Sequence, residues 1–183
     1  RPDLEYDVDH QGDFFFLRLN DRGRNFRLVK APVTDPREER WVEVLPHRPD
    51  VHLWGQLCLA RQVVALERER AVPQVRVLSA DGSEAYRLAF PEASYSVFPQ
   101  NNEEYETSKL RYRYSSFVTP PSVYDHDLDR REAQLLKRQE VPGGYEPERY
   151  QVERLEAPAP DGARVPVSMV YRKDLRRSGP QPI

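Results

Sequence analysis

The sequence predicts an all-β fold of three consecutive four-stranded units, the arrangement of blades in a β-propeller. Short apolar runs recur at a spacing of 48 residues, each unit holds four such runs, and Gly, Pro, Asn or Asp interrupt them. Runs rich in Val, Leu, Tyr and Phe between such breaks are typical of β-strands. Four strands in about 40–50 residues are typical of a propeller blade. A β-sandwich with evenly spaced strands is the alternative.

The predicted strands follow one another in the same order in each unit. First strands are expected at residues 4–8, 52–57 and 94–98, and second strands at 13–19, 61–67 and 109–115. Third strands are expected at 26–29, 74–77 and 122–125, and fourth strands at 41–45, 85–90 and 133–136. Breaks at 20–23, 70–73 and 119–121 separate second from third strands. Residues 130–139 have some helical character, but the repeat predicts a strand there.

Three blades do not close a ring, because propellers have roughly four to eight. A blade buries its apolar faces against its neighbours. We therefore expect an uncovered blade face in the first unit and another in the last. These faces predict that the isolated chain self-associates, or that further blades cover them in a longer protein. A chain that opens with Arg1-Pro2 and no Met is expected to be part of something longer.

A boundary is predicted at residues 141–150, where Gly143-Gly144 lies between Pro142 and Pro147. Proline gives a sheet no N–H, and paired glycines are poor strand residues. We expect blades over residues 1–140, a linker over 141–150 and the start of a second domain over 151–183. That start reads as a hairpin, with strands at 150–156 and 165–171. Gly143 and Gly144 are a candidate interdomain hinge; a fixed tight turn that requires glycine is the alternative.

Composition excludes several classes of protein. The chain is 38% hydrophobic and 32% charged with a net charge of −2, which favours a folded globular domain over a disordered one. No apolar run is long enough to span a membrane, and no signal peptide is visible. Near-neutral mixed charge argues against a nucleic-acid surface. We expect neither a membrane nor a nucleic acid as partner.

No histidine or cysteine pattern predicts a metal or cofactor site. The four histidines, His10, His47, His52 and His126, do not fall at a metal-ligand spacing. Cys58 lies in an apolar run and is expected to be a small buried residue.

The polar clusters also read as structural. Ser115-Ser116 lacks the glycines of a nucleophile elbow, so no catalytic residue is predicted in this chain. Residues 125–127, Asp-His-Asp, read as the polar surface of a blade. Residues 101–107 form an acidic loop, expected to be solvated; the alternative is that it lines a funnel for basic ligands.

Several phrases resemble one family. They are residues 6–13, 25–29, 45–48 and 110–116, and most strongly 136–145, continuing through 161–168 and 171–173. They resemble oligopeptidase B and, with it, the prolyl oligopeptidase family of serine peptidases. The phrase at residues 98–100, Phe-Pro-Gln, departs from that pattern, and it places the conformation of the third blade's entry in question.

The resemblance implies a seven-bladed propeller that caps an α/β-hydrolase domain and gates substrate access. It implies a cytoplasmic enzyme, without cofactor, that cleaves short peptides after Arg or Lys. This chain would supply the last three blades and the first hairpin of the hydrolase domain. The catalytic serine, aspartate and histidine would lie beyond Ile183, so the isolated chain is expected to be inactive. The alternative from another class is a stand-alone propeller that binds partners or acts as a scaffold.

Overall fold

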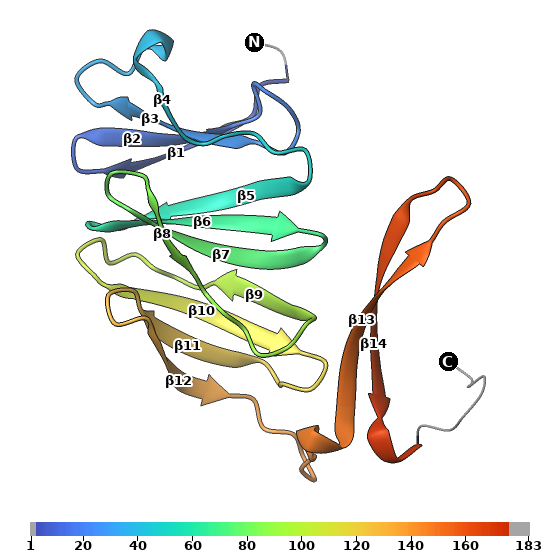
Figure 1. Ribbon diagram of the computed structural model, residues 1–183. Helices are drawn as coiled ribbons and strands as arrows, with labels where there is room; N and C mark the ends of the chain where they lie inside the picture. The colour runs from blue at the N-terminus through green and yellow to red at the C-terminus, as the bar shows by residue number, and fades with distance from the viewer. Residues whose placement is uncertain (1–2, 176–183) are drawn as a thin grey trace.

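A computed structural model describes residues 3–175 of the chain. Residues 1–2 and 176–183, which include the end of the predicted second domain, lie outside the described residues. Within the described part, three four-stranded sheets stack on one another and a two-stranded sheet stands beside them (Figure 1).

The strands of each large sheet pair in sequence order, and all pairs are antiparallel. The first sheet holds β1 (Tyr6–Gln11), β2 (Phe14–Leu19), β3 (Arg27–Pro32) and β4 (Val42–Leu45). The second holds β5 (Val51–Cys58), β6 (Gln62–Glu69), β7 (Val72–Ser79) and β8 (Glu84–Arg87). The third holds β9 (Tyr95–Pro99), β10 (Lys109–Ser116), β11 (Ser122–Asp127) and β12 (Glu132–Arg138). The strands predicted from the repeat are confirmed, including the one within residues 130–139, and meander sheets of this kind are consistent with propeller blades.

One predicted break is shorter than expected. The sequence predicts a break over residues 70–73, but β7 already begins at Val72, and Pro73 pairs with Arg68. Only Arg70 and Ala71 form the turn, with φ of 48° and 64°. Two residues with positive φ match the right-handed twist of a hairpin. Glycine or asparagine usually occupies such positions, so the sequence predicted the break but not its two-residue length.

Two apolar cores lie between the stacked sheets. Between the first and second sheets, Phe16 and Leu28 pack with Leu53, Val63 and Leu78. The core between the second and third sheets is richer in aromatic residues: Val64, Leu66, Val75, Val77, Val97, Leu110, Tyr112 and Tyr114 are buried there. Burial of this apolar surface holds each sheet to its neighbour.

The outer faces of the stack differ in chemistry. Tyr6 and Val8 of β1 point away from the second sheet and are 63% and 51% exposed. In β10, Tyr112 and its alternate neighbours pack inward, so Arg111 and Arg113 lie on the outer face and are exposed. The third sheet is therefore basic along β10, while Phe98, Leu135 and Leu136 of β9 and β12 are exposed apolar residues of the same sheet.

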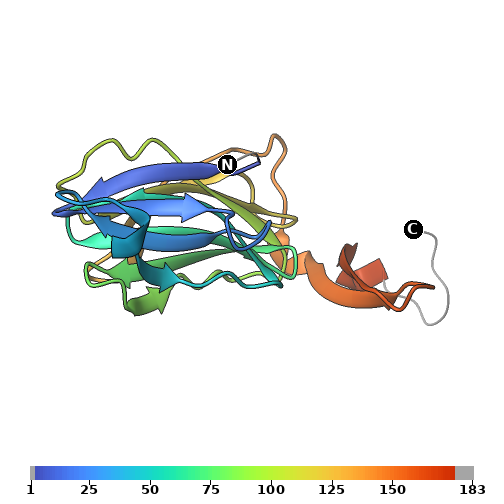
Figure 2. The same ribbon diagram turned by 90° about the horizontal axis from the view of Figure 1, so that it is seen from above.

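The chain leaves the stack through a linker and a short 3₁₀ turn, η2 (Pro147–Arg149). The hairpin β13 (Tyr150–Pro158) and β14 (Arg164–Arg172) follows, and ends in η3 (Lys173–Leu175). Seen from above, this hairpin projects from one side of the sheets (Figure 2). The remaining short helix, η1 (Glu38–Arg40), precedes β4. No helix among residues 3–175 is long and apolar enough to cross a membrane.

Candidate functional site

The four histidines lie apart in the structure. His10 is on β1, His52 on β5 and His126 on β11, while His47 lies between β4 and β5. Within residues 3–175, no group of three or more His, Cys, Asp or Glu side chains is placed to hold a metal ion. Cys58 is 5% exposed, as predicted, and burial with the charge of Asp9 raises the pKa of its thiol. A thiol of that kind is a poor nucleophile at neutral pH.

The Asp-His-Asp stretch at residues 125–127 alternates between two faces of β11. Asp125 pairs with Arg111 on the outer face at 2.7 Å, and this pairing lowers the pKa of Asp125. His126 does not lie on a blade surface as expected. It is 7% exposed between sheets, 3.1 Å from the hydroxyl of Tyr86 on β8. Burial lowers the pKa of His126 and raises that of Tyr86 to about 12, so both groups are neutral near pH 7.

Ser116 lies in a turn between β10 and β11 that several hydrogen bonds stabilise, and we call it the 116–121 turn. Its hydroxyl accepts the N–H of Val118 at 3.1 Å and of Thr119 at 2.9 Å. The same hydroxyl donates to the carboxylate of Glu92 at 3.1 Å, and the hydroxyls of Thr119 and Tyr114 also donate to that carboxylate. Ser116 therefore stabilises the turn, and its contacts are those of a structural serine.

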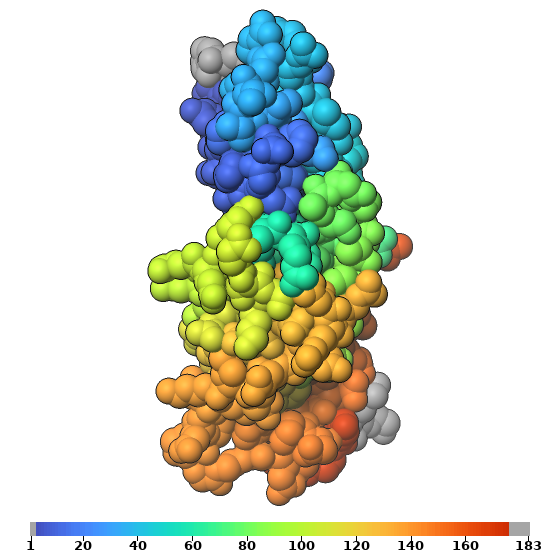
Figure 3. Space-filling view, turned by 90° about the vertical axis from the view of Figure 1, so that its left-hand side faces the viewer, coloured from blue at the N-terminus to red at the C-terminus, as the bar shows by residue number. Residues whose placement is uncertain are grey.

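The acidic loop at residues 101–107 lies on the face of the stack away from the hairpin (Figure 3). The loop leaves the third sheet and reaches the other two. Tyr105 accepts the N–H of Ala60 with its carbonyl at 3.0 Å, and the N–H of Gly12 with its hydroxyl at 3.1 Å. This segment thus ties the turns of three sheets together. Phe98, at the departure from the family pattern, lies on β9, with its ring 6.2 Å from that of Trp54.

The linker begins with a hydrogen-bonded turn at the two glycines. Gly144 donates its N–H to the carbonyl of Val141 at 2.9 Å, across Pro142 and Gly143. Proline second and a residue with positive φ third are the features of a type II turn, and Gly143 has a φ of 83°. Gly144 also has a positive φ, of 74°, and a Cβ built on either glycine would meet nothing within 4 Å. Backbone conformation, and not lack of space, is therefore what favours glycine here.

Among the described residues, two hydrogen bonds join the linker and the hairpin to the stack. Tyr145 donates its hydroxyl to the carbonyl of Val118 in the 116–121 turn, at 2.9 Å. Farther along the hairpin, the hydroxyls of Ser168 on β14 and Ser94 before β9 lie 2.8 Å apart.

Charged groups bind η2 to the end of the hairpin. Asp174 contacts Arg172 at 2.6 Å and Arg149 at 3.1 Å, and Lys173 donates to the carbonyl of Glu148 at 2.8 Å. These arginines, Arg172 foremost, hold the pKa of Asp174 at about 2.

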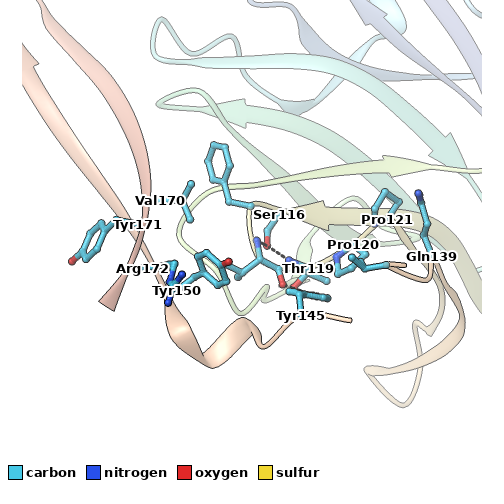
Figure 4. Close-up of a pocket in the computed structure, with 13 residues that line it drawn as sticks. Ser116, Thr119, Pro120, Pro121, Gln139, Tyr145, Tyr150, Val170, Tyr171 and Arg172 are labelled. Carbon is cyan, nitrogen blue, oxygen red and sulfur yellow. Dashed lines mark hydrogen bonds between the residues drawn. The ribbon is translucent and has the colours of Figure 1, made fainter. Parts of the chain in front are cut away.

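A cavity of about 660 Å³ lies where the stack, the linker and the hairpin meet (Figure 4). In the close-up, Tyr145 lies beside Thr119 and Pro120, while Val170 and Arg172 come from the hairpin side. The lining residues are Ser116, Phe117, Val118, Thr119, Pro120, Pro121, Gln139, Val141, Tyr145, Tyr150, Val170, Tyr171 and Arg172. This junction brings the predicted linker together with a turn that the sequence marked only as a break at 119–121.

The sequence did not indicate the partners of the linker. Tyr145 and Val118 are 27 positions apart, and Glu92 lies in a connection without any motif. Two prolines at 120 and 121 were the one available signal, because they mark a stiff turn.

Comparisons with known proteins agree on one family. A family model described as "Prolyl oligopeptidase, N-terminal beta-propeller domain" matches residues 1–139. Dipeptidyl aminopeptidase BI of Pseudoxanthomonas mexicana is 40% identical over 183 residues, covering 99% of this chain and 25% of the relative. Protease 2 of Moraxella lacunata is 27% identical, covering 100% of this chain and 26% of the relative.

Two solved structures are similar over nearly the whole chain. Oligopeptidase B from Trypanosoma brucei, in a closed form with covalently bound antipain, has a TM-score of 0.83 and 28% identity, covering 98% of this chain and 26% of that one. Oligopeptidase B from Leishmania major has a TM-score of 0.83 and 29% identity, covering 100% and 27%. The chain spans about a quarter of the length of the curated relatives it matches.

Proposed function

The chain belongs to the prolyl oligopeptidase family through its N-terminal β-propeller domain, and from that premise we propose that it is the propeller and linker part of a serine oligopeptidase. The observation that carries this proposal is the junction itself. The family match ends at residue 139, β12 ends at Arg138, and a glycine turn then leads into a separate hairpin. We propose that residues 1–140 are blades of a seven-bladed propeller, 141–150 an interdomain linker, and 151–183 the start of an α/β-hydrolase domain.

In this proposal the chain gates the access of substrates, and the rest of the protein performs the hydrolysis. Peptide hydrolysis by a serine peptidase needs a nucleophile, a base and oxyanion donors arranged together. The serines of the junction instead bond to Glu92, to backbone N–H groups and to each other. The propeller would allow only short peptides to reach the active site, and opening at Gly143 and Gly144 would admit these peptides. We place the enzyme in the cytoplasm, without a cofactor.

Two substrate classes are supported by different relatives. Cleavage of short peptides after Arg or Lys is supported by the likeness to two oligopeptidase B structures at 28% and 29% identity. Removal of dipeptides from a free N-terminus is supported by the 40% identity to dipeptidyl aminopeptidase BI. The first is our proposal, because the phrases at residues 136–145 and 161–168 also resemble oligopeptidase B.

A pair of chromogenic substrates separates these activities in the full-length protein. An N-terminally blocked peptide with Arg before the reporter is cleaved by an endopeptidase, whereas an unblocked dipeptide reporter is required by a dipeptidyl peptidase. We expect turnover of the blocked arginyl substrate. Turnover of the unblocked dipeptide alone would support the second activity, and no hydrolysis of either would favour a stand-alone binding or scaffold propeller.

A further inference from the structure

The two glycines lie in a loop whose ends are both attached to one turn of the propeller. Before them, Gln139 donates its N–H to the carbonyl of Pro121 at 2.9 Å. After them, Tyr145 donates its hydroxyl to the carbonyl of Val118 at 2.9 Å. Both acceptors belong to the 116–121 turn. Rotation about the glycine bonds therefore moves the next segment little while the tyrosine remains attached.

The acceptor side of this contact is rigid. The carbonyl of Val118 belongs to a turn closed by Ser116, which receives the N–H groups of Val118 and Thr119. Ser116 donates its own N–H to the carbonyl of Thr119 at 3.0 Å. Glu92 fixes the turn from outside by accepting the hydroxyls of Ser116 and Thr119. A carbonyl held in this way is a fixed anchor point on the propeller.

The donor side leads directly into a unit that ion pairs and a hydrogen bond hold together. Tyr145 is separated from η2 by a single residue, and η2 is tied to the end of β14 through Asp174 and Lys173. The described residues of the hairpin are partly buried or exposed and none is buried, so apolar packing against the stack is limited. Hydrogen bonds at the base of the hairpin therefore contribute much of its attachment to the stack.

We propose that the hydroxyl of Tyr145 is a latch that holds the linker closed, and that its release from Val118 precedes any hinge motion at Gly143 and Gly144. This inference rests on the proposed function, because it assigns the closed state of the proposed interdomain hinge to one hydrogen bond. The pivot then lies between Gln139 and η2. In the latched state the glycine turn is fixed, and in the released state it can rotate.

Replacing Tyr145 with Phe tests the latch, because it removes the hydroxyl and keeps the ring. An ordinary neutral hydrogen bond changes an equilibrium constant about fivefold. In the full-length protein we expect amide hydrogen exchange over residues 140–149 to rise by about that factor, with an unchanged unfolding temperature. The N–H of Gly144, bonded to Val141, is the most direct reporter.

Tyr95→Phe is the matched control. Tyr95 also donates its hydroxyl to a backbone carbonyl at 2.9 Å, that of Pro73, but within the stack. We expect this variant to leave exchange over residues 140–149 unchanged. Unchanged exchange there in Tyr145→Phe, or an equal rise in both variants, would overturn the latch. Exchange needs no turnover, so this outcome is independent of whether the protein hydrolyses peptides.

Discussion

Replacing Gly143 and Gly144 together with alanine separates a hinge from a fixed turn. Both glycines have positive φ, 83° and 74°, and neither new Cβ would meet an atom within 4 Å. The cost is therefore conformational. Alanine at such φ costs roughly 1–2 kcal/mol per residue, and its smaller unfolded-state entropy returns about 0.5 kcal/mol. The double variant should lose about 2 kcal/mol from the turn.

If the segment is a hinge, the same substitutions restrict the dihedral changes that opening requires. We then expect a slower kcat in the full-length peptidase while the fold is retained, because opening contributes to turnover. The assay compares kcat per folded molecule with the free energy of unfolding from urea titration.

Gly162→Ala is the matched control for that experiment. Gly162 has a φ of 85° in the turn between β13 and β14, and its Cβ would also meet nothing within 4 Å. It should lose about 1 kcal/mol of local stability without a change in turnover. If the double variant is destabilised but its folded fraction turns over at the parent's rate, the hinge assignment is wrong.

Three further predictions concern the stack itself. We expect the isolated chain to self-associate through the exposed face of its first sheet, and a concentration-independent monomer in sedimentation with little binding of a hydrophobic dye would argue against this. Glu67 is fully buried between Arg48 and Arg76, so Glu67→Gln should cost roughly 3 kcal/mol in urea unfolding, and a cost near zero would mean that the pairs do not stabilise the fold. Burial lowers the pKa of His126 in the folded chain, so stability that is complete above about pH 6.5 is lost as pH falls below that value. His126→Gln should flatten that part of the profile of unfolding free energy against pH, and an unchanged slope would exclude His126 as its source.

The strands could be predicted because their apolar runs recur at one spacing. Each run is local in the sequence. At residues 130–139, where β12 lies, the repeat favoured a strand over a helix. The family resemblance is confirmed as well, by the family model that matches residues 1–139 and by relatives that cover nearly the whole chain. The break at residues 70–73 was predicted, but its shortening to Arg70 and Ala71 was not, because these residues are not those that usually adopt positive φ.

The contacts of the junction could not be predicted, because they join residues far apart in sequence. Tyr145 reads as one more aromatic residue until Val118 is placed opposite its hydroxyl. The basic outer face of the third sheet, by contrast, was available in the alternation of Lys109, Arg111 and Arg113 with apolar residues. The period of two within β10 is what places these basic residues on one face of the sheet.

The most direct test of this account is where an active-site serine label falls in the full-length protein. A fluorophosphonate probe attaches to a serine that an adjacent base has activated. We expect labelling, loss of arginyl-peptide hydrolysis, and a modified serine outside residues 1–183, with the isolated chain unlabelled and inactive. A stoichiometric label on a serine of this chain, together with turnover by the chain alone, would contradict the account.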